Sequence, residues 1–243
     1  MNTNGYAALN RANWTPVTDI EKLALINNLS QGNRHKPIQH VEILSNFMTK
    51  AESFGIIINA SKGFLSPEKD KYIFVAETSS DEDCTYSLGF MNFNNRQMAF
   101  TGLAGEYIHK WNSVCFSGVF NPSRTRHTLN VDNRLEAKLD ALFGQYLKYL
   151  EDIKSSKGFL KEQEINDAVL GKVLVALHRA EVMGSTNITR IIEEFDSNAI
   201  DDSSTGWKLY GGFSNVLKRI KNPVDSITTG SVGKEIILKT LGY

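Results

Sequence analysis

Two arginines and a histidine lie close together in residues 124–128 (RTRHT). This segment follows an Asn-Pro pair and precedes a long amphipathic stretch, so it joins a predicted strand to a predicted helix. Guanidinium groups beside a helix N-terminus, flanked by hydroxyls, supply the donors that a phosphate needs. We therefore predict phosphate contacts from Arg124, Arg126 and His127. The alternative is that one arginine pairs with a carboxylate such as Glu106, and that His127 caps the fold.

A second basic group, containing Lys218 and Arg219, lies at the end of a predicted helix over residues 207–220. These cations complement the helix dipole in any case, but they can also contact phosphate. Trp111 is predicted to lie in a loop, where an exposed aromatic ring beside basic residues can stack on the bases of a single strand. We predict a nucleic-acid interface that contains Trp111, Lys218 and Arg219 together with the arginine segment.

Residues for catalysis are harder to find. The five histidines form no HExxH pair and no CxxC motif occurs, so no metal site or cofactor is predicted. The acidic run Asp81-Glu82-Asp83 is predicted to be a solvated turn, because consecutive acids splay apart. Residues 230–234 (GSVGK) resemble a phosphate loop with the wrong glycine spacing, which favours a flexible turn. We assign no catalytic residue.

The composition is that of a globular protein. The chain has 243 residues, 41% of them hydrophobic, and 27 basic residues balance 27 acidic ones. This balance excludes a uniformly basic nucleic-acid coat but allows a locally basic groove. No apolar run approaches 18 residues and the N-terminus has no apolar signal segment, so we expect a cytoplasmic protein without a membrane partner, and with reduced Cys84 and Cys115.

The apolar periodicity predicts an α+β fold. A helical stripe covers residues 41–54, strands are predicted at 56–60, 71–78, 84–93, 97–108 and 113–120, and helices follow over 132–153, 161–183, 188–195 and 207–220. The result is a mostly antiparallel sheet of about five strands packed against several C-terminal helices. We divide the chain into an N-terminal arm (1–36), an α+β core (37–195) and a C-terminal helical segment (196–243) that packs on the core.

Two stretches carry a resemblance to a known family. Residues 114–118 (VCFSG) followed by 124–128 (RTRHT), and residues 206–218 (GWKLYGGFSNVLK), resemble the phage/plasmid-like proteins of unknown function, which occur in phages, plasmids and prophage islands. The similar region covers about residues 86–222. The resemblance implies a mobile-element protein but no established activity. The order of helix, β-meander and long helix is also loosely similar to phage single-strand annealing proteins.

Three hypotheses on function follow. The leading one is a phage-encoded, non-enzymatic protein that binds or anneals single-stranded DNA and oligomerises through its N-terminal arm. The second is a host-takeover or anti-defence protein that contacts a host protein through an apolar patch on the 207–220 helix. The third is an enzyme whose site is assembled only in the fold, around Glu106, His109 and His127.

Overall fold

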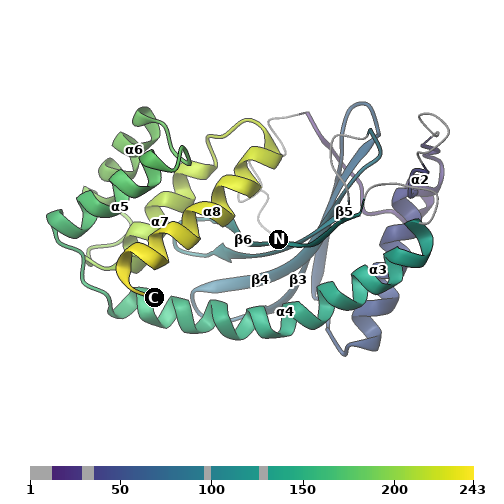
Figure 1. Cartoon of the computed structure of the whole chain (residues 1–243), viewed down its shortest axis with the longest axis horizontal. Coiled ribbons are helices and arrows are strands. Elements are labelled where there is room, and N and C mark those ends of the chain that lie inside the picture. Colours follow the sequence, from purple (N-terminus) through teal and green to yellow (C-terminus); the bar gives the residue numbers. More distant parts are fainter. Residues whose placement is uncertain (1–12, 29–35, 96–99, 126–130) are drawn as a thin grey trace.

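The computed structural model describes residues 13–28, 36–95, 100–125 and 131–243; for 117–125 and 131–133 it describes the main chain alone. Within these residues the chain forms a six-stranded antiparallel sheet and seven helices (Figure 1). The predicted α+β class, with several C-terminal helices, is confirmed.

The sheet is a simple meander, in which each strand pairs with the next one along the chain. Aromatic and β-branched residues fill its centre, because such side chains pack well on a pleated surface. The strands are β1 (Thr15–Pro16), β2 (Ala60–Leu65), β3 (Lys71–Ser80), β4 (Cys84–Phe93), β5 (Phe100–Ile108) and β6 (Ser113–Thr125).

Three strands differ from the prediction. The strand predicted at 56–60 is wrong: that segment connects a helix to the sheet, Ile57 is 74% exposed, and the strand begins at Ala60. β1 was not predicted, because two residues carry no periodicity. β6 continues past residue 120 to Thr125 through a bulge, since Phe100 pairs with Thr125 while Gly102 pairs with Phe120.

The helices are α2 (Ile20–Ala24), α3 (His40–Ser53), α4 (Val131–Glu162), α5 (Asp167–Arg179), α6 (Ser185–Asp196), α7 (Gly206–Leu217) and α8 (Pro223–Leu241). The long helix predicted over 161–183 is wrong. α4 ends at Glu162, and residues 163–165 pair with the loop before α7 through the bonds Ile165 N–H to Ser204 O and Gly206 N–H to Gln163 O. The Asn166 side chain then caps α5.

The turn predicted at residues 230–234 is also wrong, because these residues lie inside α8. Pro223 lies in the first turn of this helix, and the Asn222 side chain caps it. The two glycines allow close packing: a Cβ at Gly233 would overlap the ring of Phe213, and one at Gly230 would crowd Cys115. Tertiary packing therefore stabilises a helix that local propensity does not favour.

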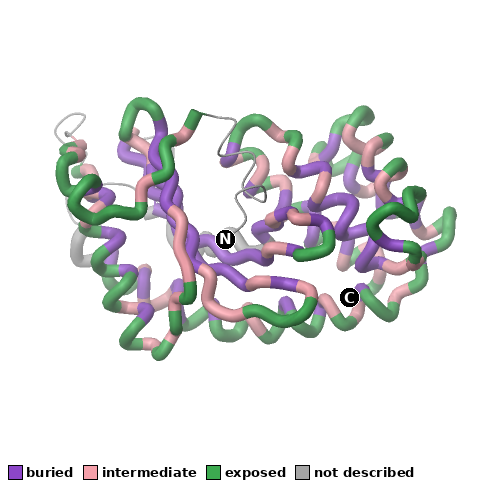
Figure 2. Tube along the Cα trace, turned by 180° about the vertical axis from the view of Figure 1, so that it is seen from behind, coloured by how far each residue is buried: buried purple, intermediate pink, exposed green. Residues whose placement is uncertain are grey.

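The helices cover the sheet unequally along its length. α3 and the first half of α4 pack on Phe74, Phe90 and Ala104, whereas α7 and α8 pack near Cys115 at the start of β6. Figure 1 shows α4 running under the sheet from α3 toward the C-terminal helices. β4 and β5 are buried over most of their length, as is the central part of β3 (Figure 2). Burial raises the pKa of the Cys115 thiol to about 12, which makes it chemically inert.

The described part of the N-terminal arm packs on its own chain. Leu23 of α2 is fully buried, β1 pairs with β2, and the Tyr72 hydroxyl donates to Val17 O. Residues 1–12 and 29–35 lie outside the described residues, and oligomerisation through the arm stays a prediction.

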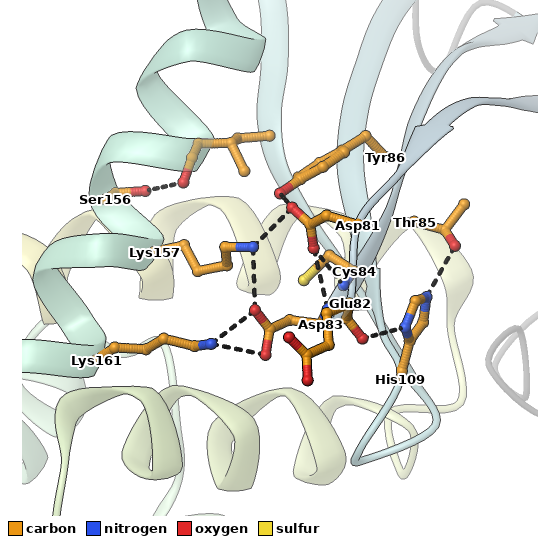
Figure 3. A network of polar contacts seen from close by, with 11 residues as sticks. Asp81, Glu82, Asp83, Cys84, Thr85, Tyr86, His109, Ser156, Lys157 and Lys161 are labelled. Atoms are coloured by element: carbon orange, nitrogen blue, oxygen red, sulfur yellow. Dashed lines mark hydrogen bonds and ion pairs between the residues drawn. The ribbon is translucent and has the colours of Figure 1, made fainter.

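The acidic run at the β3–β4 turn is not merely solvated, contrary to the prediction. Lys157 Nζ lies 2.7 Å from Asp81 and 3.1 Å from Asp83, and Lys161 Nζ lies 2.7 Å from Asp83 (Figure 3). Partial burial raises the pKa of Asp81, but bonds from Lys157, Tyr86 and the backbone outweigh it and hold that pKa below its usual value. This network fastens the turn to the C-terminal half of α4.

Candidate nucleic-acid interface

The start of β3, the end of β4, the start of β5 and the end of β6 meet at one end of the sheet. Lys71 at the start of β3 pairs with Phe93 at the end of β4, Met91 pairs with Thr101, and Phe100 pairs with Thr125 at the end of β6. The start of β3 and the end of β6 are three strand spacings apart, about 14 Å. We call the face formed here by Trp14, Lys71 and Phe93, with the neighbouring turn residue Lys69 and the main chain of 124–125, the Trp14–Lys71 end.

Two aromatic rings and a lysine form the centre of this end. The Trp14 and Phe93 ring centroids are 6.3 Å apart, and Lys71 Nζ lies 5.9 Å from the Phe93 centroid. Trp14 and Lys71 are half-buried, whereas Phe93 is 3% exposed. Phe93 therefore packs against both side chains, and Trp14 and Lys71 each keep part of their surface open to solvent. Such a pair offers a stacking surface beside a cation.

Hydrogen bonds hold the neighbouring β2–β3 turn. Lys69 has a φ of 59°, its side chain is exposed, and its carbonyl lies 3.1 Å from His40 Nε2. Since a carbonyl only accepts, Nε2 carries the proton and Nδ1 accepts from Asn92 Nδ2 at 2.9 Å. Burial lowers the pKa of His40 to about 4, so the ring is neutral near pH 7. The turn presents Lys69 from a fixed backbone.

The predicted arginine segment begins at the same end. Arg124 belongs to the bulged part of β6, between Phe120 and Thr125, and only its main chain is described. A bulge changes the direction in which the strand's side chains project. Arg126 and His127 lie outside the described residues, and their predicted phosphate contacts stay predictions.

Trp111, Lys218 and Arg219 lie at the opposite end. Trp111 precedes the start of β6, and the eight steps of β5 between the two ends span about 27 Å. The indole is 3% exposed: it packs edge-on to Trp207 at 6.2 Å and against Gly211 of α7. Buried in this way, it offers no open ring face to a base, which weakens the stacking role predicted for it.

Lys218 and Trp111 are nevertheless brought together. Lys218 Nζ donates to the Trp111 carbonyl at 3.1 Å, so this lysine holds the β5–β6 turn against the end of α7. Arg219 is exposed beside it. These two cations therefore lie far from the main chain of Arg124 and do not form one compact site with it.

Glu106 pairs with a partner that the sequence did not indicate. Lys234 Nζ lies 2.7 Å from its carboxylate, and the Tyr210 hydroxyl donates to the same oxygen. All three side chains are almost fully buried between β5, α7 and α8, and the Lys234 ammonium lies over the Tyr210 ring at 5.2 Å. The ammonium and the carboxylate compensate each other's charge away from solvent. The cluster is a packing contact rather than an accessible site.

The residues of the hypothetical enzyme site are not assembled among the described residues. His109 is exposed at the β5–β6 turn, away from buried Glu106; its Nδ1 donates to Glu82 O and its Nε2 accepts from Thr85 Oγ1, both at 2.9 Å (Figure 3). Its third member, His127, lies outside the described residues. No group of three or more histidine, cysteine or acidic side chains able to hold a metal ion occurs in the ranges that the structure covers.

The apolar patch predicted for protein–protein contact is also not found on α7. Trp207, Tyr210, Phe213 and Leu217 are all buried, because α7 packs against α4, α6, α8 and β6. Leu209 on the same helix is fully buried as well. α7 is therefore a central helix of the C-terminal lobe, by which we mean α5 to α8, rather than an exposed one.

The side chains at the Trp14–Lys71 end, Trp14, Lys69, Lys71 and Phe93, were not identified from the sequence. Lys69 and Lys71 are two residues apart but alternate with Glu68 and Asp70, and only the strand register brings Lys71 beside Phe93. The sequence carried one signal of this contact, the alternation of side chains between the two faces along β3 and β4. It places Lys71 and Phe93 at matching ends of paired strands.

Among the described helices, none is long and apolar enough to cross a membrane. Comparisons with protein-family models, with curated proteins and with solved structures found no match to this chain. The resemblance to the phage/plasmid-like proteins therefore stays a prediction, and any account of function rests on the site itself.

Proposed function

We propose that this protein binds single-stranded nucleic acid at the Trp14–Lys71 end of its sheet, without catalysing a reaction. Trp14 stacks on a base, and Lys69, Lys71 and Arg124 contact the phosphates. The observation that carries the proposal is the Trp14–Phe93–Lys71 cluster, with ring centroids 6.3 Å apart and the ammonium 5.9 Å from the shared ring. Stacking on an aromatic ring beside cations is the usual means of holding a single strand without reading its sequence.

The charge distribution supports the same proposal. Residues 162–206, which include α5 and α6, contain nine acidic and three basic residues, a net charge of −6. Since the whole chain balances 27 against 27, the remainder carries +6. At the Trp14–Lys71 end, neither Lys69 nor Lys71 forms an ion pair with a described carboxylate. A protein of zero net charge thus carries its positive excess outside residues 162–206, and Lys69 and Lys71 are available to a polyanion although Glu68 and Asp70 alternate with them along the chain.

Tryptophan fluorescence tests the stacking contact directly. The chain has three tryptophans, and Trp111 and Trp207 are 3% and 6% exposed whereas Trp14 is half-buried. Titration with an oligothymidylate of about 20 nucleotides is expected to quench the emission of Trp14. Trp14→Leu should abolish the quenching and weaken binding about 10-fold, which corresponds to the lower part of the range for one base stack.

Trp14→Phe is the matched control, because it keeps an aromatic ring on Phe93. It should retain most of the affinity, measured by anisotropy of a labelled oligonucleotide. Equal affinity for the wild type and Trp14→Leu would show that Trp14 does not stack on a base.

A further inference from the structure

The outer edge of β2 is only partly covered by β1. β1 pairs with Phe64 and Leu65, and one further bond joins Val17 N–H to Gly63 O at 2.8 Å. That bond shows that the main chain of Gly63 faces the outer edge. Because these directions alternate along a strand, the N–H and C=O of Ser61 face the same edge. Among the described residues, no hydrogen bond reaches them there.

A notch lies where β1 leaves this edge. After Val17 the chain turns away, since the Asp19 side chain caps α2 by accepting from the Glu21 and Lys22 N–H groups. The cavity left beside β2 has a volume of about 200 Å³. It is large enough for about six water molecules or an equivalent side chain.

The lining of the notch combines apolar and polar groups. It is lined by the apolar residues Val17 and Phe64, by the hydroxyl residues Thr18 and Ser61, and by Lys62. Burial lowers the pKa of Lys62, although Glu77 on the neighbouring strand acts in the opposite direction. A half-buried ammonium favours a carboxylate close to it, because a second anion offsets the lost hydration.

We propose that residues Ala60–Gly63 of β2 bind an extended peptide segment of another protein as an added edge strand, with an aspartate or glutamate of that peptide beside Lys62. The peptide continues the line of β1, pairs with the Ser61 main chain and fills the notch with a side chain. Main-chain bonds give such β-augmentation its affinity, and the pocket gives it specificity.

Charge favours a foreign peptide over a second copy of this chain. The edge segment reads Ala60-Ser61-Lys62-Gly63 and contains no acidic residue. Pairing of two such segments would place one Lys62 near the other, and like charges across paired strands are destabilising. Nor does a nucleic acid supply the alternating N–H and C=O groups that match Ser61.

Selection from a random heptapeptide display library tests the proposal. Ser61→Pro removes the outward N–H, and an edge strand tolerates proline there; Ser61→Ala keeps the N–H and is the matched control. We expect wild type and Ser61→Ala to enrich a consensus containing Asp or Glu, and the selected peptide to bind Ser61→Pro at least about 10-fold more weakly. Lys62→Met should remove the acidic preference. Oligonucleotide affinity should stay unchanged in all three variants, which separates this surface from the proposed function.

Three results would overturn the proposal: no consensus, a consensus that binds Ser61→Pro equally well, or self-association of the wild type that Ser61→Pro abolishes. Should Ser61→Pro fail to fold by circular dichroism, amide hydrogen exchange on the wild type decides. A bound peptide must then slow exchange at Ser61, and unchanged exchange there contradicts β-augmentation.

Discussion

His40 is a buried neutral side chain that uses both ring nitrogens, one toward Lys69 O and one toward Asn92. Its lowered pKa, about 4, makes it sensitive to acid. The unfolded chain binds a proton near pH 6.5 and the folded chain does not, so stability falls as the pH decreases from about 6.5 to about 4.

The loss over this window should amount to about 3 kcal/mol in the free energy of unfolding. Urea unfolding at several pH values measures this loss. In His40→Gln the free energy of unfolding should no longer fall over this pH window. The variant should keep the further loss below about pH 4, which the lowered pKa values of Asp81 and Asp83 produce. If the stability of His40→Gln falls with decreasing pH as steeply as that of the wild type, a group other than His40 causes the loss.

Glu106 and Lys234 form a buried ion pair, and each side chain depends on the other. Lys234→Met should destabilise the protein by about 3–5 kcal/mol, because it leaves the Glu106 carboxylate buried without its cation. Glu106→Gln combined with Lys234→Met should recover part of the loss. A double-mutant cycle from urea unfolding checks this, and strictly additive losses would argue against coupling.

The residues of the candidate site were only partly predictable from sequence. Adjacent basic residues, such as 124–126, are visible in the sequence, and the strand ladder places the main chain of Arg124 and Thr125 at the Trp14–Lys71 end. Trp111 was expected to be accessible because it follows a strand in a polar turn, but α7 covers it. Whether a loop is covered depends on a helix about a hundred residues later, and local pattern carries no information on that.

At the scale of elements, α7 approaches the β5–β6 turn so closely that no side chain fits at Gly211. A Cβ there would overlap the Trp111 indole. Gly211→Ala should therefore destabilise the fold by about 1–3 kcal/mol, despite the better helix propensity of alanine, and shift the Trp111 emission. Thermal unfolding and fluorescence measure both.

Gly171 in α5 is the matched control, because a Cβ there meets no atom within 4 Å. Gly171→Ala should stabilise the protein by about 0.5–1 kcal/mol. If both substitutions stabilise, the contact between α7 and Trp111 is looser than described.

Long periodic elements were predictable, and short or glycine-rich ones were not. The stripe over 41–54 became α3, since its apolar residues recur at three and four. β2 contains serine, lysine and glycine, which are poor strand residues, and it forms because β3 pairs with it along its whole length. α8 is stabilised in the same way, by contacts with β6 and α5.

At the scale of the whole molecule, zero net charge conceals a separation of charge. The −6 of residues 162–206 lies in the C-terminal lobe, at the far end of α4 from α3 (Figure 1). Under the proposed function, an anionic strand would be repelled by residues 162–206 and attracted to the rest of the molecule, which would orient it before contact.

The salt dependence of oligonucleotide binding tests this account most directly. Anisotropy titrations from about 50 to 200 mM salt should show log K falling linearly with log salt, and Lys71→Gln should reduce the slope by about 0.7, the value of one phosphate contact on a single strand. Lys148→Gln, at an exposed position on α4, should leave the slope unchanged. Absence of binding at about 50 mM salt, or equal slopes for the wild type and Lys71→Gln, would contradict binding at the Trp14–Lys71 end.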